Sequence, residues 1–142
     1  MRTNVYLKNL NHLHARVRDD RQLEVVVSGL PAYNGAQVAV DATLVSPLKR
    51  NGEARPRAHW EDGAALKDAR KAKATRYPEL LLSRRCQLLC AGMEVGGRWD
   101  EQAYAFLVEL ALAKAQEVPR TLRGAATHSW LQQWVPYCPK LA

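Results

Sequence analysis

Two carboxylates and one lysine occupy places in this sequence where charged groups are unusual. Glu24 interrupts one β-branched run, and Asp41 interrupts another. A buried acid needs a partner, because removing a charge from water is costly. A divalent cation is one such partner: Mg²⁺ binds carboxylate oxygens and keeps several waters, which suits it to phosphodiester hydrolysis. Glu24 and Asp41 are therefore candidate ligands for Mg²⁺ or Mn²⁺, and together with Lys73 they are the candidate catalytic residues.

The two acids belong to segments that read as a β-hairpin. Residues 21–28 form a β-branched run that ends at a Gly- and Pro-containing turn, residues 29–35. Residues 37–46 form a second run, closed by Pro47, which cannot donate to a sheet ladder. The length and apolarity of this second run predict an interior strand.

The register of this hairpin decides whether the acids meet. Symmetric closure places Val26 opposite Ala39 and therefore Glu24 opposite Asp41, on one face of the sheet. Directly opposed residues have Cβ atoms about 4.5–5.5 Å apart, and like charges at that distance are unfavourable unless something neutralises them. A bound cation would neutralise them.

The helix that supplies the lysine is expected over residues 64–77, with Asp62 as its N-cap. At about 100° per residue, one stripe of this helix should pack on the sheet, while Lys67 and Lys71 point away. Lys73 is in that stripe, where its ammonium can reach the acids. The stripe consists of Leu66, Ala69, Lys73 and Tyr77.

Each of the three charged residues also has a purely structural explanation. Glu24 can be an edge residue facing solvent. Asp41 can form a buried salt bridge with Arg84 or Arg85. Lys73 can lay its aliphatic stem on the core and keep its ammonium in water.

The remaining segments complete a mixed α/β fold. Residues 86–95 predict a strand covered on both faces, joined to the strand at 37–46 by a helical crossover and hence parallel to it. Between them, residues 49–57 read as a mobile basic loop. Asp100 should cap a helix that ends before Pro119, and another helix is expected over residues 122–134. We expect a mixed central sheet with a hairpin and a βαβ crossover, flanked by helices.

Composition bounds the class of protein. With 142 residues and 47% apolar content, the chain is the size of one domain, residues 1–142, with residues 119–142 as a helical extension. A net charge of +7 and a pI near 9.6 favour a polyanionic partner such as nucleic acid. Neither a membrane-spanning run nor a signal peptide is recognisable, so we expect an intracellular protein without a membrane partner. The strand-like start at Val5 also fits a segment of a longer polyprotein.

An acid in each of two strands and a nearby lysine resemble the PD-(D/E)XK, or restriction-endonuclease-like, nuclease superfamily. Residues 40–48, VDATLVSPL, and 69–77, ARKAKATRY, are similar to the endonuclease region of non-LTR retrotransposon polyproteins. In that region the lysine has moved to the helix, in a pattern that Lys73, Arg76 and Tyr77 match. Residues 94–99, EVGGRW, extend the similarity.

The resemblance implies a Mg²⁺- or Mn²⁺-dependent DNA endonuclease, with Glu24 and Asp41 holding the ion and Lys73 offsetting charge on the scissile phosphate. It further implies a nuclear location and a reverse transcriptase domain of the same polyprotein as partner. Basic residues would grip the DNA backbone, and two further residues would support the site. The DNA-binding candidates are Lys49, Arg50, Arg70 and Arg76; the supporting residues are Tyr77 and Glu94.

One feature departs from the superfamily pattern. The first acid is usually aspartate, often after proline, whereas this chain has Glu24 after Leu23. The extra methylene shifts the carboxylate by about one bond length, and a misplacement near 1 Å can cost about 10²-fold in rate. An inactive copy that keeps the fold is therefore one alternative, and a non-catalytic basic nucleic-acid-binding module is another.

Overall fold

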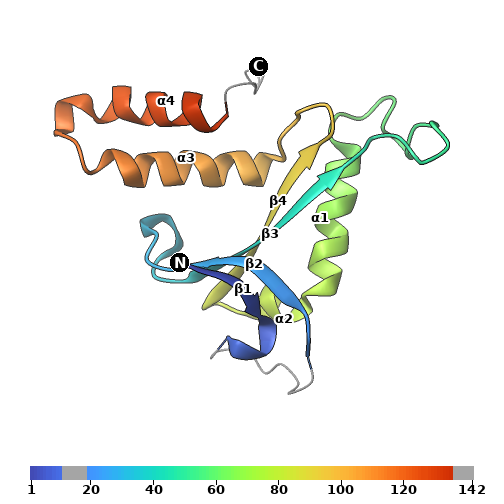
Figure 1. Ribbon diagram of the computed structural model, residues 1–142, viewed down its shortest axis with the longest axis horizontal. Helices are drawn as coiled ribbons and strands as arrows, with labels where there is room; N and C mark the ends of the chain where they lie inside the picture. Colours follow the sequence, from blue (N-terminus) through green and yellow to red (C-terminus); the bar gives the residue numbers. More distant parts are fainter. Residues whose placement is uncertain (11–18, 136–142) are drawn as a thin grey trace.

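A computed structural model describes residues 1–10 and 19–135. Four strands form one mixed sheet in the order β1-β2-β3-β4 (Figure 1). Strand β2 is antiparallel to both β1 and β3, and β3 and β4 are parallel. The strands are β1 (Arg2–Tyr6), β2 (Gln22–Val27), β3 (Gln37–Val45) and β4 (Cys86–Glu94).

Helices cover both faces of the sheet. In Figure 1, α1 and α2 lie on one side, α3 lies on the other, and α4 packs along α3 away from the sheet. The helices are α1 (Ala64–Arg76), α2 (Pro78–Leu82), α3 (Glu101–Ala115) and α4 (Arg123–Trp134). Short 3-10 turns lie at Leu7–Asn9, Pro31–Tyr33 and Arg120–Leu122. None of the helices in the described ranges is long and apolar enough to cross a bilayer.

The core has two parts because side chains alternate between the faces of the strands. On the α1 and α2 side, Ala39 and Cys86 pack with Tyr77 and Leu80. On the α3 side, the packed residues are Val38, Val40, Leu89 and Phe106. Strand β3 lies between two neighbours and is buried over most of its first half, as its apolar sequence predicts.

The predicted order of elements is confirmed in its main features. Val26 pairs with Ala39 in the β2–β3 hairpin, the β3–β4 crossover is parallel, and Asp100 Oδ2 accepts a hydrogen bond from Gln102 N at 3.0 Å at the start of α3. The prediction that Asp62 caps α1 is wrong. Gly63, with a φ of 72°, takes the N-cap position without a side-chain bond, because its left-handed backbone turns the chain into the helix.

The connection from β3 to α1 is more ordered and less basic than the sequence suggests. Leu48 and Ala54 form an isolated bridge, and Lys49 Nζ lies 3.3 Å from Glu53 Oε2. Arg57 contacts both Glu61 and Asp68. Much of the positive charge expected on this loop is therefore neutralised within the protein.

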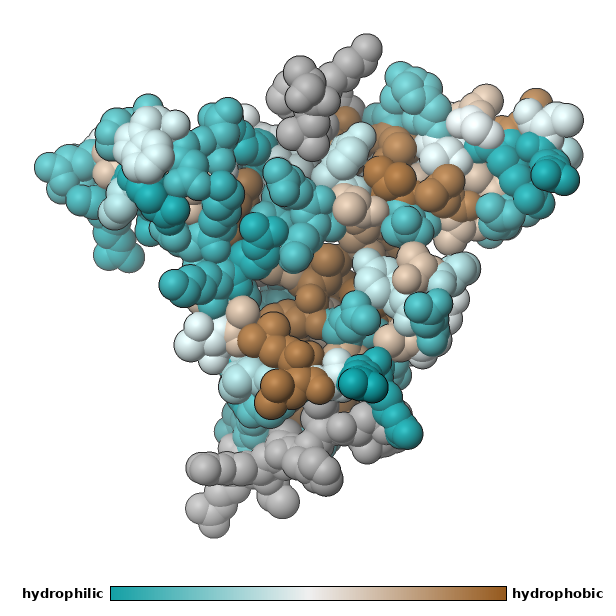
Figure 2. Space-filling view, turned by 180° about the vertical axis from the view of Figure 1, so that it is seen from behind, coloured by the Kyte–Doolittle hydropathy of each residue, from teal (hydrophilic) through white to brown (hydrophobic). Residues whose placement is uncertain are grey.

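Exposed apolar residues gather over α2. Leu81 is 61% exposed and Leu82 is 88% exposed. Figure 2 shows apolar surface over this helix, continuing towards β4. The inward residue of the same turn, Leu80, is buried in the core, so α2 is anchored by one side chain and presents the others to solvent.

Strand β4 is at the edge of the sheet, but a returning segment covers its last residues. Asp100 N donates to Gly92 O at 2.9 Å, and Glu94 N donates to Arg98 O at 2.8 Å. A Cβ at Gly92 would lie 3.0 Å from Leu66 Cδ2 and 3.3 Å from Asp100 Cβ. The absence of a side chain at Gly92 thus allows α1 to approach the sheet closely.

We expect Gly92→Val to lower the free energy of unfolding by about 1–3 kcal/mol, because the added atoms would overpack the contact with Leu66. Urea denaturation followed by circular dichroism measures the change. Gly96→Val is the matched control, since nothing lies within 4 Å of a Cβ at Gly96. Equal stability of the two variants would contradict the close approach.

Candidate functional site

The hairpin opens where the two candidate acids lie. Val25 pairs with Val40 at this end of the β2–β3 ladder. Beyond that pair, β2 continues against β1, with Leu23 beside Val5, while β3 continues against β4, with Asp41 beside Cys90. Figure 1 shows the two strands diverging. The sheet therefore has a fork that begins at Glu24 and Asp41.

Asp41 is buried at the base of this fork and faces α1. Its Oδ2 lies 2.9 Å from Lys73 Nζ, and the two side chains are 6% and 20% exposed. No hydrogen bond of acceptable geometry reaches Oδ2 from the described residues, so the contact with Lys73 is an ion pair held by charge. The prediction that Lys73 faces the sheet and reaches Asp41 is confirmed.

The alternative ion pair of Asp41 with Arg84 or Arg85 is not formed. Both arginines precede β4, whose first residue, Cys86, pairs with Gln37 at the opposite end of β3 from Asp41. The parallel register therefore carries the arginines away from the acid. Lys73 reaches it because α1 crosses back over the middle of the sheet.

Glu24 is exposed, and it contacts the main chain beside Asp41. Its Oε2 accepts a hydrogen bond from Ala42 N at 3.1 Å. The side chain thus satisfies a donor that the diverging β2 backbone leaves without a ladder partner. This contact brings the Glu24 carboxylate to the peptide that follows Asp41. That both carboxylates bind one ion stays a prediction.

Tyr77 holds the end of α1 against the start of β2. Its ring is 1% exposed, and its hydroxyl donates to Gln22 O at 2.8 Å. Burial, together with the nearby charge of Asp41, raises the pKa of the Tyr77 hydroxyl, which therefore stays a donor at neutral pH. The guanidinium groups of Arg21 and Arg76 lie 5.7 and 5.6 Å from the ring centre. Tyr77 fixes the helix from which Lys73 projects.

A second buried ion pair lies one turn earlier on α1. Arg70 Nη1 is 3.4 Å from Asp100 Oδ1, and Asp100 is 4% exposed. Sequence reasoning proposed Arg70 as a phosphate contact and did not find this pair. The available signal was its spacing, because Arg70 lies three residues before Lys73 and so shares its side of the helix.

Glu94 is the third buried acid of the described residues, 8% exposed at the end of β4. Its Oε2 lies 3.8 Å from Arg98 Nε. Cys90, Gly92 and Glu94 share the α1 side of β4, the side that Asp41 also faces. Each buried acid on this side therefore has a basic residue within 4 Å.

The remaining DNA-binding candidates lie on the surface. Arg50 and Arg76 are exposed, and neither forms an ion pair within the described residues. Lys71, on the outer side of α1, is likewise exposed. Lys49 is already paired with Glu53. Lys71 and Arg76 therefore carry most of the unpaired positive charge of α1 within the described residues.

The oxygen donors at the fork suit a hard cation such as Mg²⁺, which prefers carboxylate oxygens. Across residues 1–10 and 19–135 there is no group of three or more His, Cys, Asp or Glu side chains arranged to hold a metal. Mg²⁺ is commonly held by one or two carboxylates, with waters and substrate phosphates completing its shell. Two acids of this chain are thus compatible with such a site.

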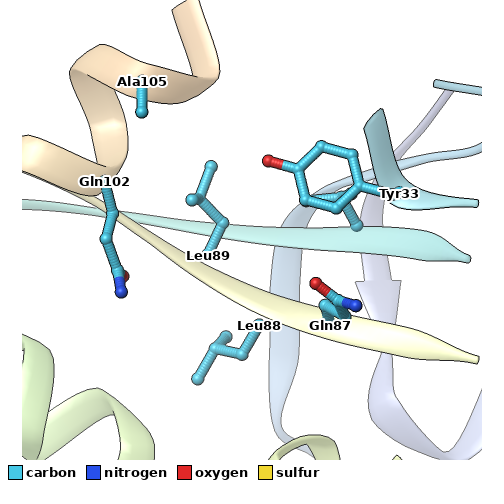
Figure 3. Close-up of a pocket in the computed structure, with 7 residues that line it drawn as sticks. Tyr33, Gln87, Leu88, Leu89, Gln102 and Ala105 are labelled. Atoms are coloured by element: carbon cyan, nitrogen blue, oxygen red, sulfur yellow. The ribbon is translucent and has the colours of Figure 1, made fainter. Parts of the chain in front are cut away.

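A separate cavity of about 220 Å³ lies on the other side of the sheet, between α3 and β4. Figure 3 shows Gln102 and Ala105 of α3 facing Leu89 and Tyr33 across it. Burial and the charge of Glu109 raise the pKa of the Tyr33 hydroxyl. None of the three candidate catalytic residues lines this cavity.

Comparison with protein-family models, curated proteins and solved structures gives no match to this chain.

We expect Tyr77→Phe to lower the free energy of unfolding by about 1 kcal/mol, because it removes the hydrogen bond to Gln22 O and keeps the ring. Chemical denaturation measures this loss. Tyr104→Phe on α3 serves as the control, because no hydrogen bond of its hydroxyl is found within the described residues. If both variants unfold like the wild type, the Tyr77 hydroxyl does not fix α1 to β2.

Proposed function

We propose that this chain is a divalent-metal-dependent nuclease that hydrolyses phosphodiester bonds in DNA. The observation that carries the proposal is the 2.9 Å contact between Asp41 and Lys73 at the sheet fork, with Glu24 bonded to the adjoining peptide. Direct contact of Asp41 with Lys73, together with the reach of Glu24 to the next peptide, supports a site of the kind that the resemblance to PD-(D/E)XK nucleases implies.

The roles follow from charge and position. Asp41 and Glu24 would hold the ion, which supplies Lewis acidity and a water of lowered pKa. Lys73 stands beside the acids on a helix that crosses the sheet, so its ammonium is placed to offset negative charge on a phosphate at the fork. In the net reaction, water adds to phosphorus, one P–O ester bond breaks, and the leaving oxygen gains a proton.

Exposed basic residues of α1 supply the electrostatic attraction for the substrate. Lys71 and Arg76 are exposed, and both lie within one turn of Lys73 on the same helix. Lysine and arginine contacts to phosphates dominate nucleic-acid affinity and make it sensitive to salt. The net charge of +7 is consistent with such a substrate. The resemblance extends the proposal to a reverse transcriptase domain as a functional partner.

A non-catalytic DNA-binding module is the second candidate function, and two contacts favour it. Asp41 is already neutralised by Lys73, and Glu24 already accepts a hydrogen bond from the main chain. Both acids thus have structural partners without any metal. In this alternative, the basic residues of α1 bind DNA, and no phosphodiester bond is hydrolysed.

Nicking of supercoiled plasmid in Mg²⁺ separates the two candidates. We expect the wild type to nick DNA only with the metal, Asp41→Asn to be inactive, and Lys73→Ala to be slower by about 10²–10³-fold. Lys114→Ala is the control, because this lysine pairs with Glu117 on α3 and should leave the rate unchanged. Metal-independent binding without nicking would instead establish the binding module.

DNA binding has its own test, in the salt dependence of affinity. We expect the double variant Lys71→Ala/Arg76→Ala to bind duplex DNA more weakly and to reduce the slope of log K against log salt by about 2, because two phosphate contacts are lost. Fluorescence anisotropy across a salt series measures this. Lys114→Ala/Arg120→Ala removes the same charge on α3 and the following turn, and an equal effect of that pair would argue against α1 as the interface.

A further inference from the structure

The ammonium of Lys73 lies where a cation bound to Asp41 would be expected. Nζ is 2.9 Å from Oδ2, and only 6% of the Asp41 side chain is exposed. A Mg²⁺ ion coordinated by a carboxylate lies about 2.0–2.1 Å from its oxygen. An ion on Oδ2 would therefore meet a second positive charge within a few ångströms, in a partly desolvated place where repulsion is strong.

Within the described residues, the Lys73 side chain has no ion pair or hydrogen bond other than its contact with Asp41. Oδ2 receives no hydrogen bond of acceptable geometry from the described residues, so its contact with the ammonium is an ion pair. The Lys73 side chain remains 20% exposed, and its flexible four-carbon stem leaves the ammonium a route towards solvent. Arg70, one turn away, is held by Asp100 and does not compete for Asp41.

We propose that Lys73 occupies the cation position on Asp41 in the metal-free protein and that a divalent ion must displace its ammonium in order to bind. Lys73 thus neutralises the buried acid when no metal is present, and it lowers the affinity of the site for metal. The ammonium becomes available to a substrate phosphate only after displacement. This inference rests on the proposed function, since it concerns the same acid and lysine.

The test measures Mn²⁺ binding to the full chain without DNA, by isothermal titration calorimetry and by the loss of the free-ion electron paramagnetic resonance signal. We expect Lys73→Met to bind Mn²⁺ about tenfold more tightly than the wild type, the size of a typical coupling between two ligands. Lys67→Met removes the same charge from α1, and its partner Glu61 keeps Arg57, so it should leave the affinity unchanged. Asp41→Asn combined with Lys73→Met should abolish the gain.

Thermal denaturation provides a second readout that does not depend on activity. Lys73→Met leaves Asp41 buried without its counter-charge, so we expect a lower melting temperature without metal and a larger stabilisation by Mn²⁺ than in the wild type. Unchanged or weaker Mn²⁺ binding by Lys73→Met would overturn the displacement proposal. If the wild type also nicks plasmid, that outcome leaves the nuclease function standing. Tighter binding without any nicking would support displacement and reject the nuclease.

Discussion

The buried ion pair between Asp41 and Lys73 determines how the rest of the molecule is arranged. Only 6% of the Asp41 side chain is exposed, and a buried charge without a counter-charge is costly, so α1 crosses the sheet with the side that carries Lys73 inward. Gly92 permits this crossing at close range, and Tyr77 fastens the end of the helix to β2. The contact between helix and sheet is therefore partly apolar, through Leu66, and partly ionic.

The fork in the sheet leaves this buried ion pair close to an exposed carboxylate, that of Glu24. In an uninterrupted ladder, the main-chain groups beside Asp41 would be paired with β2 and the acid would be enclosed. Because the part of β2 before Val25 pairs with β1 and no longer with β3, the Ala42 amide donates to the Glu24 carboxylate instead, and an exposed carboxylate is held next to the peptide of a buried one. The two acids therefore differ in their surroundings: the Glu24 side chain is exposed to solvent, and the Asp41 side chain is buried.

Elsewhere in the protein, more of the positive charge is paired with acidic side chains than the composition implies. Lys49, Arg57 and Arg70 all pair with acids, and so contribute little free positive potential. Lys71 and Arg76 keep theirs, and they lie on the same helix as Lys73. The loop after β3 therefore contributes less free positive charge than its sequence suggests.

The sequence by itself determined the elements and the direction of the key side chains. The length and apolarity of residues 37–46 identified an interior strand, and helical periodicity singled out Lys73 from Lys67 and Lys71, because both signals are local. Tertiary structure alone decided the partners: the fork at Glu24 and the Asp100–Arg70 pair. These depend on where strands diverge and on which end of β4 meets the helix. These contacts join residues that are far apart in the chain, and a local sequence pattern does not encode them.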